Sequence, residues 1–282
     1  MYTFLLILVT IIWGSTFVII KDTVASVNEY FIVFVRCSMA AVPMLLVQLF
    51  RAPKLLFERK AVGRGLVMGF LLAATYASQT IGLKFTSAGH SAFITGSAVV
   101  IVPIVLFLGY RELLTLRDAF AIGVTFSGLF LLAYDFGTRV NPGDLITLIT
   151  VAAYAFHVVL AGRFVRDADA ASMIAWQFAG AGIFSLLVFL AAAPGPGTLT
   201  MKSMWALVYL GIPGTLFCYF VTVWIQKHVS SVLVALTFSL EPVFAAIFGF
   251  IVLGERLDAK ELLGAALVLA GVALYQVWRA RA

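Results

Sequence analysis

The residue best suited to chemistry in this sequence is Glu241, which lies in the middle of an apolar segment and directly before Pro242. A charged side chain at that depth in a bilayer costs about 3 kcal/mol or more, so it is expected where function requires it. The carboxyl group could exchange a proton or bind the ammonium group of a substrate. Pro242 removes a backbone donor and exposes a carbonyl oxygen nearby. A structural glutamate bonded to a neighbouring helix is the alternative; we predict a substrate-binding and proton-coupling role.

Polar side chains recur at helical spacing along several other apolar segments. A lone Ser or Thr can bond its own helix backbone or support helix packing. Tyr, His and Gln at matching depths in several helices instead favour a polar cavity. The aromatic members could stack on an apolar group or a cation. The residues predicted to bind substrate in this cavity are Trp13, Thr16, Tyr76, Gln79, Thr95, Tyr154, His157, Trp176, Tyr219 and Glu241.

Two further features of the apolar segments leave several interpretations open. Arg36 lies about two helical turns into its segment. Its guanidinium could extend to the membrane surface, hold a carboxylate with two hydrogen bonds, or pair with an acidic residue. Gly14, next to Trp13, suits either a close backbone approach or simple tight packing. Gly65 and Gly69 have the spacing of a helix contact, and we expect packing only.

Motifs for enzymatic chemistry are missing from the sequence. It contains 3 histidines but no H-E-x-x-H, no G-x-S-x-G and no G-x-x-x-x-G-K-[ST] motif. We therefore predict no catalytic residue, no metal site and no cofactor. Any transport would be driven by an ion gradient or by the gradient of the substrate itself. The 2 cysteines, Cys37 and Cys218, lie within apolar segments, which favours buried thiols over a disulfide.

The composition indicates an all-α membrane protein. Of 282 residues, 63% are hydrophobic and 11% are charged, whereas about 25% are charged in a soluble domain. A helix needs roughly 20 apolar residues to cross a bilayer, and the alternating polarity of barrel strands is absent. Ten transmembrane helices are predicted at residues 2–20, 29–50, 62–83, 90–109, 116–134, 142–162, 170–192, 202–225, 231–253 and 260–279.

The basic residues of the chain are distributed as the positive-inside rule requires. The predicted outer loops hold Lys21, Lys84, Arg139, Lys202, Arg256 and Lys260. The remaining Lys and Arg residues, except Arg36, fall on the opposite side. The formal charge of +6 therefore indicates orientation rather than nucleic-acid binding. We predict a multi-pass membrane protein with both termini in the cytoplasm.

A tandem repeat divides the chain. An offset of 143 residues relates Glu112 to Glu255, Tyr76 to Tyr219, Ser87 to Ser230 and Gly128 to Gly271. Nearer the N-terminus an offset of 141 relates Trp13 to Tyr154 and Arg36 to Gln177. We place the slip of two residues in a connecting segment, where length changes are tolerated best. We predict two five-helix repeats, 1–137 and 138–282, around a central cavity. Because five is odd, the second repeat is inverted, as in many secondary transporters.

The resemblance to a known family rests on Ile12-Trp13-Gly14-Ser15-Thr16-Phe17 with Lys21, Arg36, Glu241-Pro242-Val243-Phe244-Ala245-Ala246, and Leu253-Gly254-Glu255 with Gly264 and Gly271. In this pattern the chain resembles the EamA-type exporters of the drug/metabolite transporter superfamily over essentially its whole length. The resemblance implies a location in the bacterial inner membrane, with spans one to four and six to nine around a cavity and spans five and ten at the edge. It also implies that Glu112 and Glu255 are structural residues at helix ends. In the first repeat Val99 stands where Pro242 aligns and no acidic residue answers Glu241, so the cavity is chemically lopsided.

We predict a secondary active exporter of small metabolites, such as amino acids or their derivatives, that works by alternating access. Glu241 would take the ammonium group, and His157 and Gln79 would orient the polar end. The alternatives are an importer of a vitamin-like or nucleotide-sugar-like solute, or a lipid flippase or envelope-assembly partner. A lipid path would need an opening towards the bilayer lined by mixed residues. The expected partners are a small-molecule substrate and membrane lipid, and ten spans suffice to enclose a cavity in a monomer.

Overall fold

The computed structural model is almost entirely helical over the residues that it describes, which are 1–133, 141–192, 195–254 and 258–280. The predicted repeat boundary at 137/138 and the predicted helix-end residue Glu255 lie outside these ranges. Within the described residues, nine helices are long and apolar enough to cross a membrane. The helix at the fifth predicted span, α7 (Leu116–Ala133), is not among these nine. The all-α membrane fold is confirmed, whereas the count of ten spans stays a prediction.

Each predicted span corresponds to one helix or to a consecutive run of helices. The first half contains α1 (Tyr2–Thr23), α2 (Glu29–Arg51), the short α3 (Pro53–Leu56), α4 (Arg59–Phe85), α5 (Ala88–Gly96), α6 (Ala98–Tyr110) and α7. The second half contains α8 (Pro142–Phe164), α9 (Ala170–Ala192), α10 (Met201–Gly211), the π-helical η1 (Ile212–Phe217), α11 (Cys218–Ile225), α12 (Ser231–Phe238), α13 (Glu241–Phe248), the π-helical η2 (Gly249–Leu253) and α14 (Ala259–Ala280).

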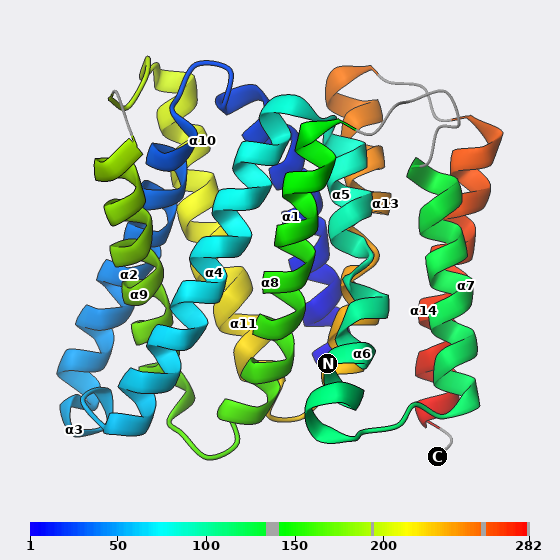
Figure 1. Ribbon diagram of the computed structural model, residues 1–282, viewed down its shortest axis with the longest axis horizontal. Coiled ribbons are helices and arrows are strands. Elements are labelled where there is room, and N and C mark those ends of the chain that lie inside the picture. The colour runs from blue at the N-terminus through cyan, green and yellow to red at the C-terminus, as the bar shows by residue number, and fades with distance from the viewer. Residues whose placement is uncertain (134–140, 193–194, 255–257, 281–282) are drawn as a thin grey trace.

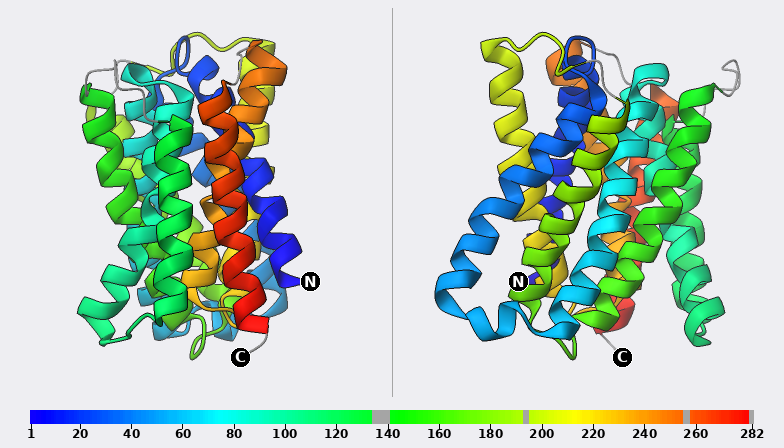
Figure 2. Two further views of the ribbon diagram at one scale, coloured as in Figure 1. Left: turned by 90° about the vertical axis from the view of Figure 1, so that its right-hand side faces the viewer. Right: turned by 60° about the vertical axis from the view of Figure 1, so that its left-hand side comes forward.

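The two halves run through the bundle in opposite directions (Figure 1). α1 begins at the end of the bundle where α14 finishes, and successive spans alternate in direction, so that α8 runs opposite to α1. α7 and α14 pack side by side at one edge, apart from the remaining helices (Figures 1 and 2). The inverted repeat and the edge position of the fifth and tenth helical segments agree with the expectations from sequence.

The repeat is visible in the local structure of equivalent residues. Ser87 and Ser230 each cap a helix, and their Oγ atoms accept hydrogen bonds from the backbone N–H groups of His90 and Leu233 at 3.1 and 3.2 Å. Further along, Arg111 and Gly254 each end a span in the left-handed backbone conformation, with φ of 57° and 69°. Both pairs are separated by 143 residues, so the two copies share helix starts and helix stops as well as sequence.

The fourth and ninth spans are both broken in the middle. α5 gives way to α6 at Ser97, and α12 gives way to α13 at Ser239 and Leu240. At each break the serine Oγ donates to the carbonyl oxygen three residues earlier, at 2.6 Å in both copies. Such bonds satisfy a carbonyl that the interrupted helix would otherwise leave unpaired. The break therefore belongs to the repeat and does not depend on a proline.

Glycines bring several helices into backbone contact. A Cβ on Gly14 would lie 2.6 Å from the Cβ of Phe244 and 3.1 Å from the carbonyl oxygen of Glu241. The absence of a side chain thus lets α1 approach the start of α13. Gly65 and Gly69 of α4 face α9, where added Cβ atoms would meet backbone atoms of that helix. The close approach at Gly14 and the packing role of Gly65 and Gly69 are confirmed.

Candidate functional site

A small cavity lies between the two halves in the middle of the bundle. Its volume is about 20 Å³, which is room for about one water molecule. It is lined by Trp13, Thr16, Phe17, Arg36, Thr75, Tyr76, Gln79, Thr95, Tyr154, Tyr219 and Glu241. These residues come from α1, α2, α4 and α5 in the first half and from α8, α11 and α13 in the second. The structure thus brings together eight of the ten residues predicted to bind substrate.

Glu241 is positioned by the break in the ninth span. It is the first residue of α13, with 4% of its surface exposed. A carboxylate at a helix N-terminus is favoured by the partial positive charge of the free backbone N–H groups. Within the described part of the chain, its carboxyl group has no hydrogen bond and no ion pair. The alternative of a structural glutamate bonded to a neighbouring helix is therefore not what the structure shows.

Arg36 is the main residue that the predicted site lacked. Its side chain is 1% exposed, so it does not extend to the membrane surface. Its Nε donates to the Oγ1 of Thr215 at 3.0 Å, and its guanidinium carbon lies 3.5 Å from the ring centroid of Tyr76. Among the described residues no acidic side chain lies within 4.0 Å of it. Arg36 therefore faces the cavity, and the sequence signal was its charge inside an apolar segment.

Aromatic rings form much of the cavity wall. The ring of Trp13 lies 5.0 Å from that of Tyr219 and 6.2 Å from that of Tyr154, and the rings of Tyr76 and Tyr219 lie 5.7 Å apart. The indole N–H of Trp13 donates to the carbonyl oxygen of Gly214 at 2.8 Å. Gly214 belongs to η1, and π-helical turns of this kind interrupt the regular hydrogen bonding of a helix, often at functional sites. The wall suits the apolar part of an amphipathic solute.

Two predicted residues lie outside the cavity lining. The Nε2 of His157 is 3.1 Å from the Oε1 of Gln177, and the imidazole stands edge-on to Tyr219 at 5.1 Å. His157 is thus behind the wall and in contact with it. Trp176 donates its indole N–H to the carbonyl oxygen of Leu56 at 2.7 Å, next to α3. Depth along the helix, which sequence indicates, does not report which face a side chain occupies.

The hydroxyl groups of the lining divide into two kinds. Thr16 donates to the carbonyl oxygen of Trp13 at 2.7 Å, and Thr95 donates to that of Ser91 at 2.8 Å. These two hydroxyls bond their own helices, as the alternative for lone Ser and Thr residues anticipated. The buried hydroxyl of Tyr154, in contrast, has no hydrogen-bond partner among the described residues. It is a polar group available to a ligand or to water.

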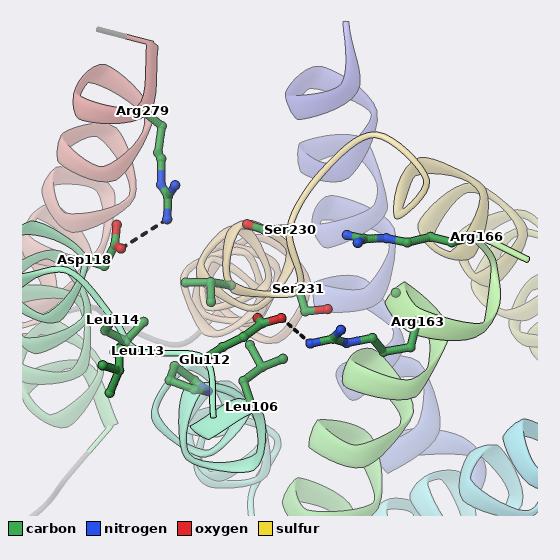
Figure 3. Close-up of a pocket in the computed structure, with 13 residues that line it drawn as sticks. Leu106, Glu112, Leu113, Leu114, Asp118, Arg163, Arg166, Ser230, Ser231 and Arg279 are labelled. Atoms are coloured by element: carbon green, nitrogen blue, oxygen red, sulfur yellow. Dashed lines mark hydrogen bonds and ion pairs between the residues drawn. The ribbon is translucent and has the colours of Figure 1, made fainter. Parts of the chain in front are cut away.

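A second cavity, of about 110 Å³, lies at the end of the bundle where α6 and α8 finish (Figure 3). Glu112 forms an ion pair with Arg163 across it. Asp118 forms another with Arg279, at 3.1 Å. Each pair joins the first half to the second, and Glu112 directly follows the left-handed residue that ends α6, in keeping with its predicted helix-end role. Because these acidic groups have partners, this cavity is an ionic clamp between the halves, and the central cavity is the better candidate for substrate.

An apolar groove of about 250 Å³ lies between α2, α4 and α9. It is lined by Tyr30, Val33, Phe70, Ala73, Ala74, Ala77, Phe184, Ser185, Leu187 and Val188. No charged residue is among them. The groove lacks the mixed lining that a path for a lipid headgroup would need.

Inverted repeats enclosing a polar cavity are the architecture of membrane transporters. The chain belongs to the EamA-like transporter family, which matches residues 1–134 and 141–276. It is 28% identical over 273 residues to an uncharacterized transporter of Archaeoglobus fulgidus, covering 95% of this chain and 83% of the relative. It is 24% identical over 275 residues to an S-adenosylmethionine/S-adenosylhomocysteine transporter of Chlamydia muridarum, covering 90% and 85%. A crystal structure with 15% sequence identity superposes with a TM-score of 0.80 over 99% of this chain and 98% of the other. The family resemblance is confirmed, and the protein is a membrane transporter.

Proposed function

We propose that the protein is a secondary active exporter of amino acids or their derivatives. The observation that carries the proposal is the partner-free carboxyl group of Glu241 in a cavity walled by aromatic rings. A buried carboxylate suits an ammonium group, and the rings of Trp13, Tyr154 and Tyr219 suit an apolar side chain or a cation. The Chlamydia relative is named for S-adenosylmethionine, which carries an α-amino-acid group, and this supports the same substrate class.

The size of the cavity supports transport by alternating access. A volume of about 20 Å³ cannot hold a metabolite, so substrate enters only when the halves separate at one end. The ionic clamp of Glu112–Arg163 and Asp118–Arg279 would then have to open on the side where it lies. Such rocking of one repeat against the other is how inverted-repeat transporters expose a central site to either face.

Glu241 is proposed to couple transport to a proton gradient. The carboxyl group can hold either a proton or an ammonium group at one time, so the two would exchange at the same site. One chain supplies the whole lining, and we infer that the monomer is the transporting unit. We place it in the bacterial inner membrane with both termini in the cytoplasm.

The first experiment is flux into proteoliposomes of labelled amino acids, with S-adenosylmethionine in the panel, with and without an imposed pH gradient. Flux of one or a few solutes, accelerated by the gradient, is expected for the wild type and absent for Glu241→Gln. Glu58→Gln is the matched control, because Glu58 is exposed at a helix start. Normal flux through Glu241→Gln would remove the residue from the mechanism. The absence of flux for every solute would reject this substrate class.

Orientation is tested by labelling cysteines introduced at Lys54 and Lys202, which are exposed at opposite ends of the bundle. The native Cys37 and Cys218 are buried and give little background. A membrane-impermeant reagent applied to intact cells is expected to label position 202 and not position 54. The reverse pattern would invert the proposed topology.

A further inference from the structure

The buried guanidinium of Arg36 has unused hydrogen-bonding capacity. Its Nη1 is shielded from solvent and has no partner among the described residues. A buried cation without a counter-ion is strongly unfavourable in a membrane bundle. Arg36 and Glu241 line the same cavity, yet they form no ion pair within 4.0 Å. The site therefore keeps two opposite charges apart in a space of about 20 Å³.

The guanidinium is held in a fixed orientation. The ring of Tyr76 covers one face at 3.5 Å, and Thr215 occupies the Nε edge at 3.0 Å. Thr215 is itself fixed, since its hydroxyl lies 2.7 Å from the carbonyl oxygen of Leu210 and 3.2 Å from the hydroxyl of Tyr76. The edge formed by the two Nη atoms is left over, and this edge is the one that binds a carboxylate with two parallel hydrogen bonds.

The backbone around Arg36 leaves room beside this edge. Gly214 has no side chain, and a Cβ there would lie 3.8 Å from Nη2 of Arg36. The equivalent of Arg36 in the second repeat is Gln177, whose amide contacts His157 and not the cavity. A cationic group therefore lies on one wall of the cavity and an acidic group on another, with no equivalent pair on the symmetry-related walls.

We propose that Arg36 binds the carboxylate of the transported solute while Glu241 binds its ammonium group, so that the site selects zwitterions over plain amines. This assignment rests on the proposed function and makes it more specific. The carboxylate would point towards α2 and η1, the ammonium group towards α13, and the side chain towards the aromatic wall. Arg36 is then a specificity-determining residue of the transport site.

The test compares binding of three probes to purified protein in nanodiscs by isothermal titration: L-phenylalanine, 3-phenylpropionate and phenethylamine. The second probe lacks the ammonium group and the third lacks the carboxylate. In Arg36→Gln we expect affinity for the two carboxylate probes to fall about 10- to 100-fold, as for a lost charged hydrogen bond, with phenethylamine unaffected. Arg36→Lys should recover only part of the loss, because it keeps the charge without the planar fork. Glu241→Gln should show the converse pattern, losing affinity for phenethylamine and keeping 3-phenylpropionate.

The outcomes separate this inference from the proposed function. An equal loss for all three probes in Arg36→Gln would mean a structural role, and no binding of either carboxylate by the wild type would reject the carboxylate site. Arg36-dependent binding of 3-phenylpropionate without amino-acid flux would support the site and reject the function. Amino-acid flux unchanged in Arg36→Gln would support the function and reject the site. Retained phenethylamine binding shows that the variant is folded.

Discussion

The two broken spans, α5–α6 and α12–α13, share a backbone and differ in chemistry. Ser97 and Ser239 make the same 2.6 Å bond to a carbonyl three residues earlier. Beyond the break the first copy continues with Ala98, which is 2% exposed, and the second with Glu241, which aligns with it at the offset of 143. The repeat thus supplies two similar interrupted helices, and only one of them carries a charge. Symmetry of the fold and asymmetry of the site are separate properties of this chain.

The largest expected effect comes from making the second copy like the first at the charged position, with Glu241→Ala. Transport should fall by about 100-fold or more, since a charged hydrogen bond to the substrate is lost in a buried site. The free energy of unfolding should be unchanged or higher, because an unpaired buried charge is removed. Flux assays and thermal unfolding on one preparation check both. A variant that unfolds more easily would mean that Glu241 is a structural residue.

The next effect concerns the contact between α1 and α13. Gly14→Ala should reduce the free energy of unfolding by about 1–3 kcal/mol, because the new methyl group overpacks against Phe244 and the carbonyl of Glu241. The equivalent residue of the second copy is already Ala155, buried at 0% exposure. Gly123→Ala is the control, since a Cβ there meets nothing within 4 Å. Equal melting temperatures for the two variants would contradict the close approach.

A smaller effect distinguishes the two equivalent tyrosines of the cavity. The hydroxyl of Tyr76 lies 3.3 Å from the carbonyl oxygen of Gly214 and 3.2 Å from Thr215. Tyr76→Phe should therefore cost about 0.5–1.5 kcal/mol of stability, as for a typical hydrogen bond. The ring contact with Tyr219 remains in either variant. Tyr219→Phe should change stability less, and a larger loss for Tyr219→Phe in denaturant unfolding would reverse the assignment.

The smallest effect is expected for Pro242→Val, which copies Val99 of the first repeat. The first break forms without a proline, so the second should persist and the free energy of unfolding should change by less than about 1 kcal/mol. Transport should decrease a few-fold at most. Hydrogen exchange at residues 238–243 measures the break directly. Strong new protection there would show that the proline, and not the repeat, interrupts the helix.

The sequence predicted the bundle well, because apolar length and the offset of 143 depend on composition and order alone. It predicted most of the cavity lining for the same reason, since Tyr76, Tyr154 and Tyr219 recur at comparable depths. It could not predict that Trp176 bonds to Leu56 beside α3, because that depends on how α9 rotates against its neighbours. It also left Arg36 open, because the absence of an acidic partner is a property of packing.

The π-helical turn η1 accounts for part of the slip between the two repeats. α2 and α9 begin 141 residues apart, at Glu29 and Ala170, whereas α4 and α10 begin 142 apart, at Arg59 and Met201. By Tyr76 and Tyr219 the offset has reached 143. One residue was therefore gained in the connecting segment and one inside the eighth span, where η1 absorbs it as a wider turn. In evolutionary terms η1 records a single inserted codon, and the carbonyl of Gly214 that Trp13 now binds lies within that insertion.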